Sequence, residues 1–234
     1  MRSFRTIGRR GVMLAGATLL TGCATPRTED TAPAEPEPTD PSPAAPADSP
    51  SPSSTAGVHE VPAELREQAD ALMAGGVVLY LRHPATTRGG TDSPDWPRER
   101  QRLLSAEGEQ QARDLGEAFK VHGWQVHEVL SSPSWRCRDA ADLAFGDYRV
   151  EPLLTGLLSE SGETEDALRA YSQELVRTQV PAGRVLVAIG HSSNIRAATE
   201  ASVSEGAGVI TRVDDGGEVQ VVGTVDAQGW AALK

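Results

Sequence analysis

The stretch that decides the fold is residues 77–84, Val-Val-Leu-Tyr-Leu-Arg-His-Pro, which follows the glycine pair at 75–76. Its short apolar run is too brief for a buried helix and is typical of a strand covered on both faces, as in a parallel sheet. Pro84 ends the strand because proline has no backbone N–H to donate. A permanent cation, Arg82, and an imidazole, His83, therefore stand at its carboxyl end. Ligands of open α/β sheets bind beyond such strand ends, so the sequence predicts a site there.

A second fully apolar strand is predicted at 185–189, and it also ends in a histidine, within Gly190-His191-Ser192. If the two strands are parallel neighbours, His83 and His191 meet at one edge of the sheet. A helix is expected to begin near Ser192 or Ser193.

A third strand is predicted at 126–130, and a helix follows it. Ser132 is expected to be the N-cap of this helix, with Pro133 at its first position, and the helix is expected to run to about Phe145. Arg136 then lies near the helix N-terminus, where backbone N–H groups and the dipole favour an anion.

The remaining patterns complete an α/β layout. They predict helices at 62–73, 105–119 with Ser105 as N-cap, and 163–179, a loop over 85–102, and a hairpin of strands 209–213 and 218–222. We therefore expect a three-layer α/β/α sandwich with a mostly parallel central sheet.

The first 23 residues predict an export signal rather than part of the fold. They carry four arginines and no acid, and residues 11–22 are free of charge but too few to span a bilayer. Leu20-Thr21-Gly22-Cys23 resembles a bacterial lipobox, which would make Cys23 the lipidated first residue of the mature protein. The alternative is an ordinary export signal with an incidental cysteine, and Arg9-Arg10 leaves the Sec and twin-arginine routes open. We expect a lipoprotein that faces outside the cytoplasm and meets the membrane through Cys23.

Residues 24–57 are dominated by Pro, Ala, Ser, Thr and acidic side chains, which predicts a disordered tether and places the folded domain at 58–234. Because the signal holds only basic charges, the net charge of −11 becomes more negative after cleavage. Such a chain should not bind nucleic acid through its overall field. Once Cys23 is lipidated, Cys137 is the one cysteine left, so no intrachain disulfide is expected.

The strand-end residues suit a phosphoryl group. The planar guanidinium groups of Arg82 and Arg136 match phosphate oxygens, and an imidazole can attack phosphorus to form a phosphohistidine. A second imidazole can stabilise the oxygens as charge develops, and neighbouring arginines favour the neutral, nucleophilic histidine. This chemistry needs no metal and no cofactor.

Four motifs, which span about residues 77–200, resemble those of the histidine phosphatase superfamily, in that family's order. They are Leu81-Arg82-His83-Pro84, Leu104-Ser105-x-x-Gly108-x-x-x-Ala112, Ser131-Ser132-Pro133-x-x-Arg136 and Gly190-His191-Ser192. The resemblance is to a phosphoglycerate mutase-like fold and, through the hairpin and Trp230, to a secreted bacterial branch. It implies that His83 is the nucleophile and that Arg82, Arg136 and His191 form the phosphate pocket. Thr86 is a further candidate phosphate ligand, or a residue that simply caps its loop.

The sequence departs from the family pattern at two positions. Pro84 stands where many members have Gly or Ala, and Gly89 stands where mutase-like members carry an Asn that touches phosphate. The second departure disfavours a mutase and suggests a rearranged loop over 86–100.

The general acid stays open. Glu160 falls where the mutase-like members keep a proton-donating glutamate, whereas the phytase-like branch has an acid directly after its second histidine, a position held here by Ser192. The alternatives to Glu160 are Glu163, Asp92 and Asp95.

The sequence therefore predicts a phosphatase that hydrolyses phosphate monoesters of a small molecule or a phosphoprotein through a phosphohistidine on His83. The competing interpretation is a phosphate-recognising binding module without turnover on the cell envelope. Neither the substrate nor the oligomeric state can be read from the sequence.

Overall fold

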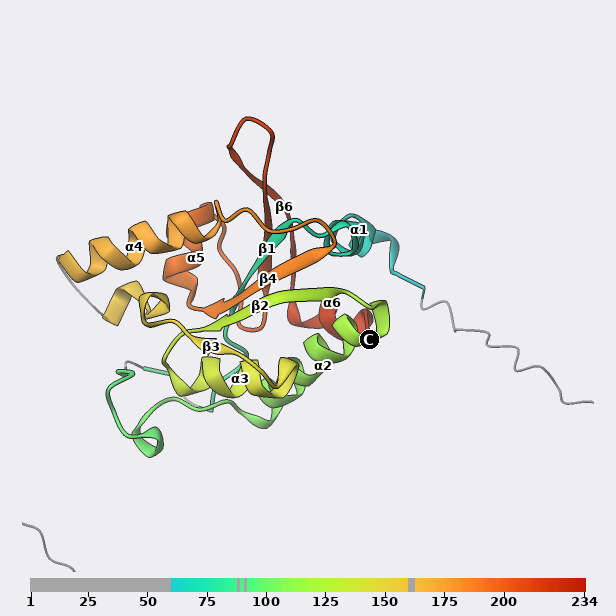
Figure 1. Cartoon of the computed structure of the whole chain (residues 1–234). Coiled ribbons are helices and arrows are strands. Elements are labelled where there is room, and N and C mark those ends of the chain that lie inside the picture. The colour runs from blue at the N-terminus through green and yellow to red at the C-terminus, as the bar shows by residue number, and fades with distance from the viewer. Residues whose placement is uncertain (1–59, 88, 91, 160–162) are drawn as a thin grey trace, which may run out of the picture. The chain divides into compact units, whose positions relative to one another are not determined.

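A six-stranded sheet forms the centre of the described part of the chain, in the order β3-β2-β4-β1-β5-β6 (Figure 1). The strands are β1 (Val77–Arg82), β2 (Gln125–Ser131), β3 (Arg149–Val150), β4 (Arg184–Gly190), β5 (Gly208–Val213) and β6 (Val219–Val225). β4 is parallel to both β1 and β2, and β2 is parallel to β3, while the β5–β6 hairpin is antiparallel and joins the sheet through β1. The predicted mostly parallel sheet is confirmed.

The structure is a computed structural model that describes residues 60–87, 89–90, 92–159 and 163–234. The predicted signal, the whole predicted tether and Cys23 lie outside the described residues, so those predictions stand untested. Among the residues described, no helix has both the length and the apolar character needed to cross a bilayer.

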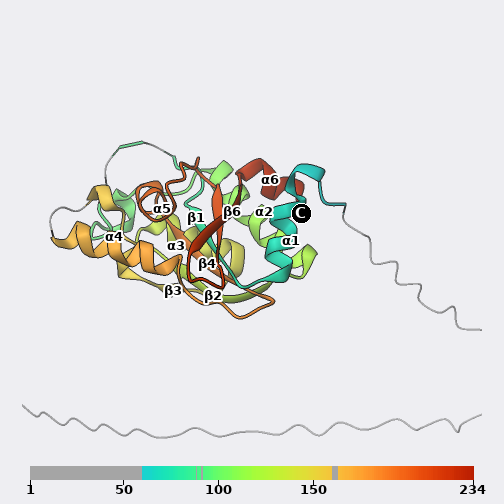
Figure 2. The same ribbon diagram turned by 90° about the horizontal axis from the view of Figure 1, so that it is seen from above.

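Helices cover both faces of the sheet, because the side chains of its central strands alternate between two buried layers. Val77, Leu79 and Leu81 of β1 belong to one apolar cluster, and Val78 and Tyr80 belong to the other. The first cluster is covered by α1 (Arg66–Ala74), α2 (Ala106–His122), α3 (Trp135–Phe145) and α6 (Ala227–Ala232), and the second by α4 (Glu163–Leu175) and α5 (Ser192–Thr199) (Figures 1 and 2). The sandwich therefore has the three layers that the sequence predicts.

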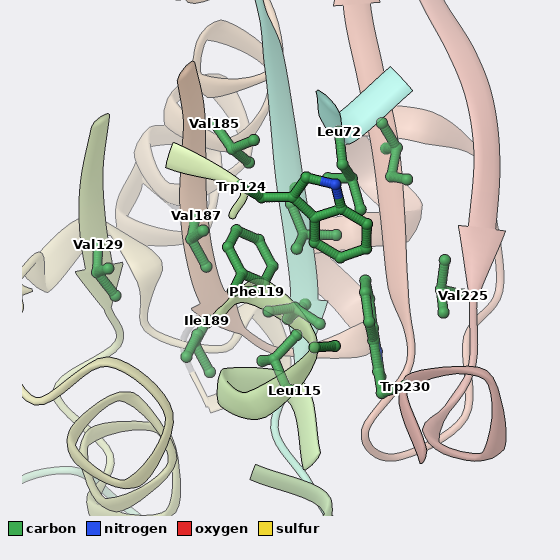
Figure 3. Packing of buried hydrophobic residues seen from close by; sticks show 14 of the residues in the cluster. Leu72, Leu115, Phe119, Trp124, Val129, Val185, Val187, Ile189, Val225 and Trp230 are labelled. Carbon is green, nitrogen blue, oxygen red and sulfur yellow. The ribbon is translucent and has the colours of Figure 1, made fainter. Parts of the chain in front are cut away.

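The larger of the two clusters is closed by aromatic side chains. Phe119 contacts Trp124 edge to face, with 5.3 Å between ring centroids, and Trp230 of α6 is almost fully buried (Figure 3). Figure 3 shows the Phe119 ring beside Val187 and Ile189 of β4, and Trp230 between Leu115 and Val225. This packing fixes β1 and β4, the two strands that end in histidine, against the α2 side of the molecule.

The structure differs from the predicted elements in several places. α3 begins at Trp135 with Ser134 in the N-cap position, two residues later than expected, so Pro133 lies before the helix. α4 ends at Leu175 rather than near 179, because the i→i+3 bonds from the N–H groups of Arg177 and Thr178 tighten and close its last turn. α6 was not predicted at all, although Asp226 caps it by accepting from the Gly229 N–H at 2.7 Å.

Candidate functional site

A pocket of about 190 Å³ lies at the carboxyl ends of β1 and β4, and Arg82, His83, Arg136 and His191 all line it. We call it the histidine pocket. The parallel register pairs Arg82 with Gly190, so the residue after each strand is a histidine at the same edge. The His83 N–H donates to the Gly190 carbonyl oxygen at 3.0 Å, and the two imidazole centroids lie 5.7 Å apart. The structure thus brings together four side chains that are far apart in the sequence.

His83 is held in one tautomer by its own neighbour. Its Nδ1 lies 2.9 Å from the Pro84 carbonyl oxygen, which can only accept, so Nδ1 carries the proton and Nε2 keeps its lone pair. Nε2 has no hydrogen-bond partner among the described residues. Burial, reinforced by the Arg136 cation, lowers the pKa of His83 to about 3. The imidazole is therefore neutral near pH 7, as a nitrogen nucleophile must be.

His191 is also neutral, and its hydrogen bonds fix the opposite tautomer. Arg136 Nη2 donates to Nδ1 at 3.2 Å, so the proton lies on Nε2, which donates to Ser132 Oγ at 2.9 Å. Burial, with Arg136 as the next cause, holds the pKa of His191 well below its usual range. The Ser132 hydroxyl oxygen also accepts from the Ser134 N–H at 3.4 Å, so Ser132 belongs to the turn before α3 and at the same time holds His191.

Arg136 lies in the first turn of α3 and forms a buried ion pair with Asp92. Its Nη1 donates to both carboxylate oxygens, at 3.0 and 3.1 Å, and the Arg102 backbone N–H donates to the same carboxylate at 2.6 Å. The loop that was expected to overlie the strand end is thereby fastened across the pocket. Asp92 was one of the alternatives for the general acid, and in the structure its carboxylate is the ion-pair partner of Arg136.

A second pair of arginines shares one carboxylate at the pocket edge. Arg82 Nη2 lies 3.4 Å and Arg102 Nη2 3.2 Å from Glu205 Oε1. Arg102 Nη2 also donates to the Thr86 hydroxyl at 2.7 Å. Thr86 contacts Arg102 but is not among the residues that line the pocket, so its direct contact with phosphate remains a prediction. No local pattern singles out Arg102 or Glu205, because both follow from contacts between distant segments.

The segment after the short 3₁₀ turn Pro152–Leu154 presses on the second histidine. Asn194 is fully buried and ties this segment down, since its side chain donates to the Thr155 carbonyl and accepts from the Leu157 N–H. Gly156 is thereby brought against His191: a Cβ added there would lie 3.2 Å from the ring Cγ. The ring of His191 is therefore fixed by packing as well as by hydrogen bonds.

For two of the other acid candidates the structure does not describe the side chain. Glu160 lies outside the described residues, and so does the side chain of Glu163. Asp95 is exposed and does not line the pocket. Among the described lining residues, Asp92 is the one carboxylate.

Cys137 is excluded as a nucleophile. It is fully buried, and burial raises the pKa of its thiol to about 12, which keeps it protonated. Within the same described residues, no group of three His, Cys, Asp or Glu side chains is placed to ligate a metal ion.

The fold and the pocket define an α/β/α protein with a cationic site built from two strand-end histidines. Residues 78–182 match the family model described as the histidine phosphatase superfamily (branch 1), so this part of the chain is similar to that superfamily. The match ends before β4, and His191 is therefore identified by its position in the pocket. No curated protein matches the chain in sequence.

Several solved structures are similar to the chain in fold. The protein histidine phosphatase SixA complexed with tungstate has 17% identity and a TM-score of 0.45, covering 65% of this chain and 97% of its own. The TTHB049 protein of Thermus thermophilus has 23% identity and a TM-score of 0.42, covering 62% and 97%. A phosphoserine phosphatase mutant of Entamoeba histolytica in complex with phosphoserine has 11% identity and a TM-score of 0.46, covering 65% and 98%. Similarities at this level carry no information on the substrate.

Proposed function

We propose that the chain is a phosphoric monoester hydrolase that works through a phosphohistidine on His83. The observation that carries the proposal is the fixed tautomer of His83, whose Nδ1 donates to the Pro84 carbonyl at 2.9 Å and leaves the Nε2 lone pair free in a pocket rich in guanidinium groups. The match of residues 78–182 to the histidine phosphatase superfamily model supports the same chemistry.

In the first step the Nε2 lone pair attacks phosphorus, a P–N bond forms, and the bond from phosphorus to the leaving oxygen breaks. The guanidinium groups of Arg82, Arg102 and Arg136 balance the charge on the phosphoryl oxygens. Both pocket histidines are neutral, so the attacking one needs no prior deprotonation. In the second step water attacks phosphorus, the P–N bond breaks, and inorganic phosphate leaves.

The leaving oxygen requires a proton, and Glu160 is the proposed donor from the sequence pattern, with Glu163 as the alternative. Glu160→Gln and Glu163→Gln distinguish them with two aryl phosphates that differ in leaving-group pKa. The rate with the poorer leaving group should fall more in the variant that lacks the true acid. Equal losses with both esters would move the role to another group.

The experiment that tests the function is a rapid denaturing quench with a radiolabelled aryl phosphate. Wild-type protein should retain label and turn the ester over, and His83→Ala should do neither. His127→Ala is the matched control, because His127 is an exposed histidine on β2 away from the pocket. Turnover without label on His83 would remove the covalent mechanism, and binding without turnover would favour the phosphate-recognising module.

We also propose that the protein is exported and anchored by a lipid on Cys23, as the leader sequence predicts. Cys23→Ala should shift the protein from the detergent phase to the aqueous phase in a partition assay. Detergent partition that is unchanged by this substitution would contradict the anchor.

A further inference from the structure

A groove of about 600 Å³ opens beside the histidine pocket and has no part in the chemistry described above. It shares Arg82, Leu158, Ser192 and Ser193 with the pocket, so the two cavities are continuous. Its other residues come mainly from α4 and α5, which lie side by side in both views (Figures 1 and 2). Whatever is attached to a phosphoryl group in the pocket can extend into this groove.

The groove carries an excess of positive charge. Among the described residues, its lining includes Arg82, Arg169 and Arg196, against a single acid, Glu165. Arg169 donates to Glu165 at 2.7 Å, and Arg82 faces Glu205 at the pocket edge. Arg196 is exposed, and its guanidinium group forms no hydrogen bond or ion pair within the described residues. It is therefore the cation of the groove that has no counter-charge there.

The position of Arg196 relates it to the site. It lies four residues after Ser192 on α5, so the two face the same side of the helix, and Ser192 lines both cavities. Leu158 lines both cavities as well, and its relative exposure is 88%, which leaves an apolar surface at the junction. A leaving group that crosses this junction would meet Leu158 first and the guanidinium group of Arg196 further on.

We propose that this groove binds the leaving group of the ester and that Arg196 selects leaving groups carrying a second anionic group. The substrate class is then a phosphate monoester with a carboxylate or a second phosphate on the alcohol side. A planar guanidinium group can bind either anion through paired hydrogen bonds. The inference rests on the proposed phosphatase function and adds the substrate class to it.

The test compares phenyl phosphate with 3-carboxyphenyl phosphate in wild-type protein, Arg196→Gln and Arg113→Gln. Arg113 is the matched control because it is an exposed arginine on α2, against the opposite face of the sheet. Arg196→Gln should lower kcat/KM for the carboxylated ester by about 10-fold or more, as expected for a lost hydrogen bond to a charged group. The same variant should change phenyl phosphate turnover by less than about twofold, within the range of surface substitutions.

For each protein we take the ratio of kcat/KM for the two esters. Comparing this ratio among the three proteins removes the intrinsic difference in reactivity between the esters. Equal effects of Arg196→Gln on both esters would overturn the inference, and so would an equal loss of discrimination in Arg113→Gln. The same comparison with benzene-1,3-diyl bisphosphate separates a second phosphate from a carboxylate as the preferred anion.

If wild-type protein hydrolyses neither ester, the proposed function fails and the groove is judged by binding alone. Calorimetric titration of the wild type with the two esters should then show tighter binding of the carboxylated one, and Arg196→Gln should abolish the preference. Equal affinities in the wild type would overturn the groove as an anion-selective subsite.

Discussion

Replacing Asp92 by alanine should destabilise the domain and strengthen its binding of inorganic phosphate. The carboxylate is the counter-charge of Arg136, and the two side chains have relative exposures of only 4% and 7%. Removing one partner of a buried ion pair costs about 3–5 kcal/mol, because the other charge stays buried without compensation. For a domain of this size, each kcal/mol corresponds to about 2–4 °C in Tm.

Phosphate should recover part of that loss, since it supplies the negative charge that Arg136 has lost. With phosphate in large excess, each tenfold gain in affinity adds about 1.4 kcal/mol of stabilisation. The increase in Tm on adding phosphate should therefore be larger in Asp92→Ala than in the wild type. Thermal melts by circular dichroism, with sodium chloride adjusted to constant ionic strength, measure both effects.

Asp95→Ala is the control, because Asp95 is exposed on the same loop and does not line the pocket. This variant should have the Tm of the wild type and the same increase in Tm on adding phosphate. Asp92→Asn keeps an acceptor for Arg136 and should be intermediate, which preserves the comparison if the alanine variant does not fold. If the increase in Tm on adding phosphate is no larger in Asp92→Ala than in the wild type, the idea that Arg136 holds both the carboxylate and the substrate anion is refuted.

Three further outcomes are expected. Gly156→Ala should lower kcat/KM for phenyl phosphate by about tenfold or more in steady-state assays, because the new methyl group lies 3.2 Å from the His191 ring and displaces it. Gly108→Ala should lower the free energy of unfolding in urea by about 1–3 kcal/mol, because its methyl group would collide with the Ala85 backbone carbonyl. Stability should fall as the pH drops from 7 to 5, because unfolded His83 takes up its proton near pH 6.5 and the folded form only near pH 3. This group alone should contribute about 2 kcal/mol of loss at pH 5, and urea melts of His83→Gln should lack that contribution.

The parts of the site that the sequence predicts are those in which local pattern and strand topology agree. An apolar run that ends in a polar residue predicts both the strand and the position where it ends. Arg82, His83 and His191 could therefore be placed at the edge of the sheet. The start of α3 could not be placed correctly, because Ser132 has the properties of a helix cap but holds His191 from the turn before the helix, and its oxygen accepts from the Ser134 N–H there. The bond to His191 is a contact across 59 positions, which no local pattern shows.

The contacts made by the irregular loop were beyond prediction for a related reason. Asp92 could be recognised as a carboxylate near the site, but its pairing with Arg136 depends on how a loop without periodic structure folds over the strand ends. The sharing of Glu205 between Arg82 and Arg102 is of the same type, since it joins the segment before α2 to the segment before β5. Charge pairing between distant irregular segments leaves no pattern in the local sequence.

The crossover order of the sheet also determines when the site comes into existence. His83 follows β1 early in the chain, but the parallel neighbour of this strand, β4, is made about a hundred residues later. A nascent or truncated chain that ends after α4 therefore has a histidine at a bare strand end, without His191 or the N-terminus of α5 beside it. Loop closure over such a span is among the slower steps of folding. Recovery of enzymatic activity on refolding should consequently lag behind recovery of helical signal, and it is the stricter criterion of a completed native state.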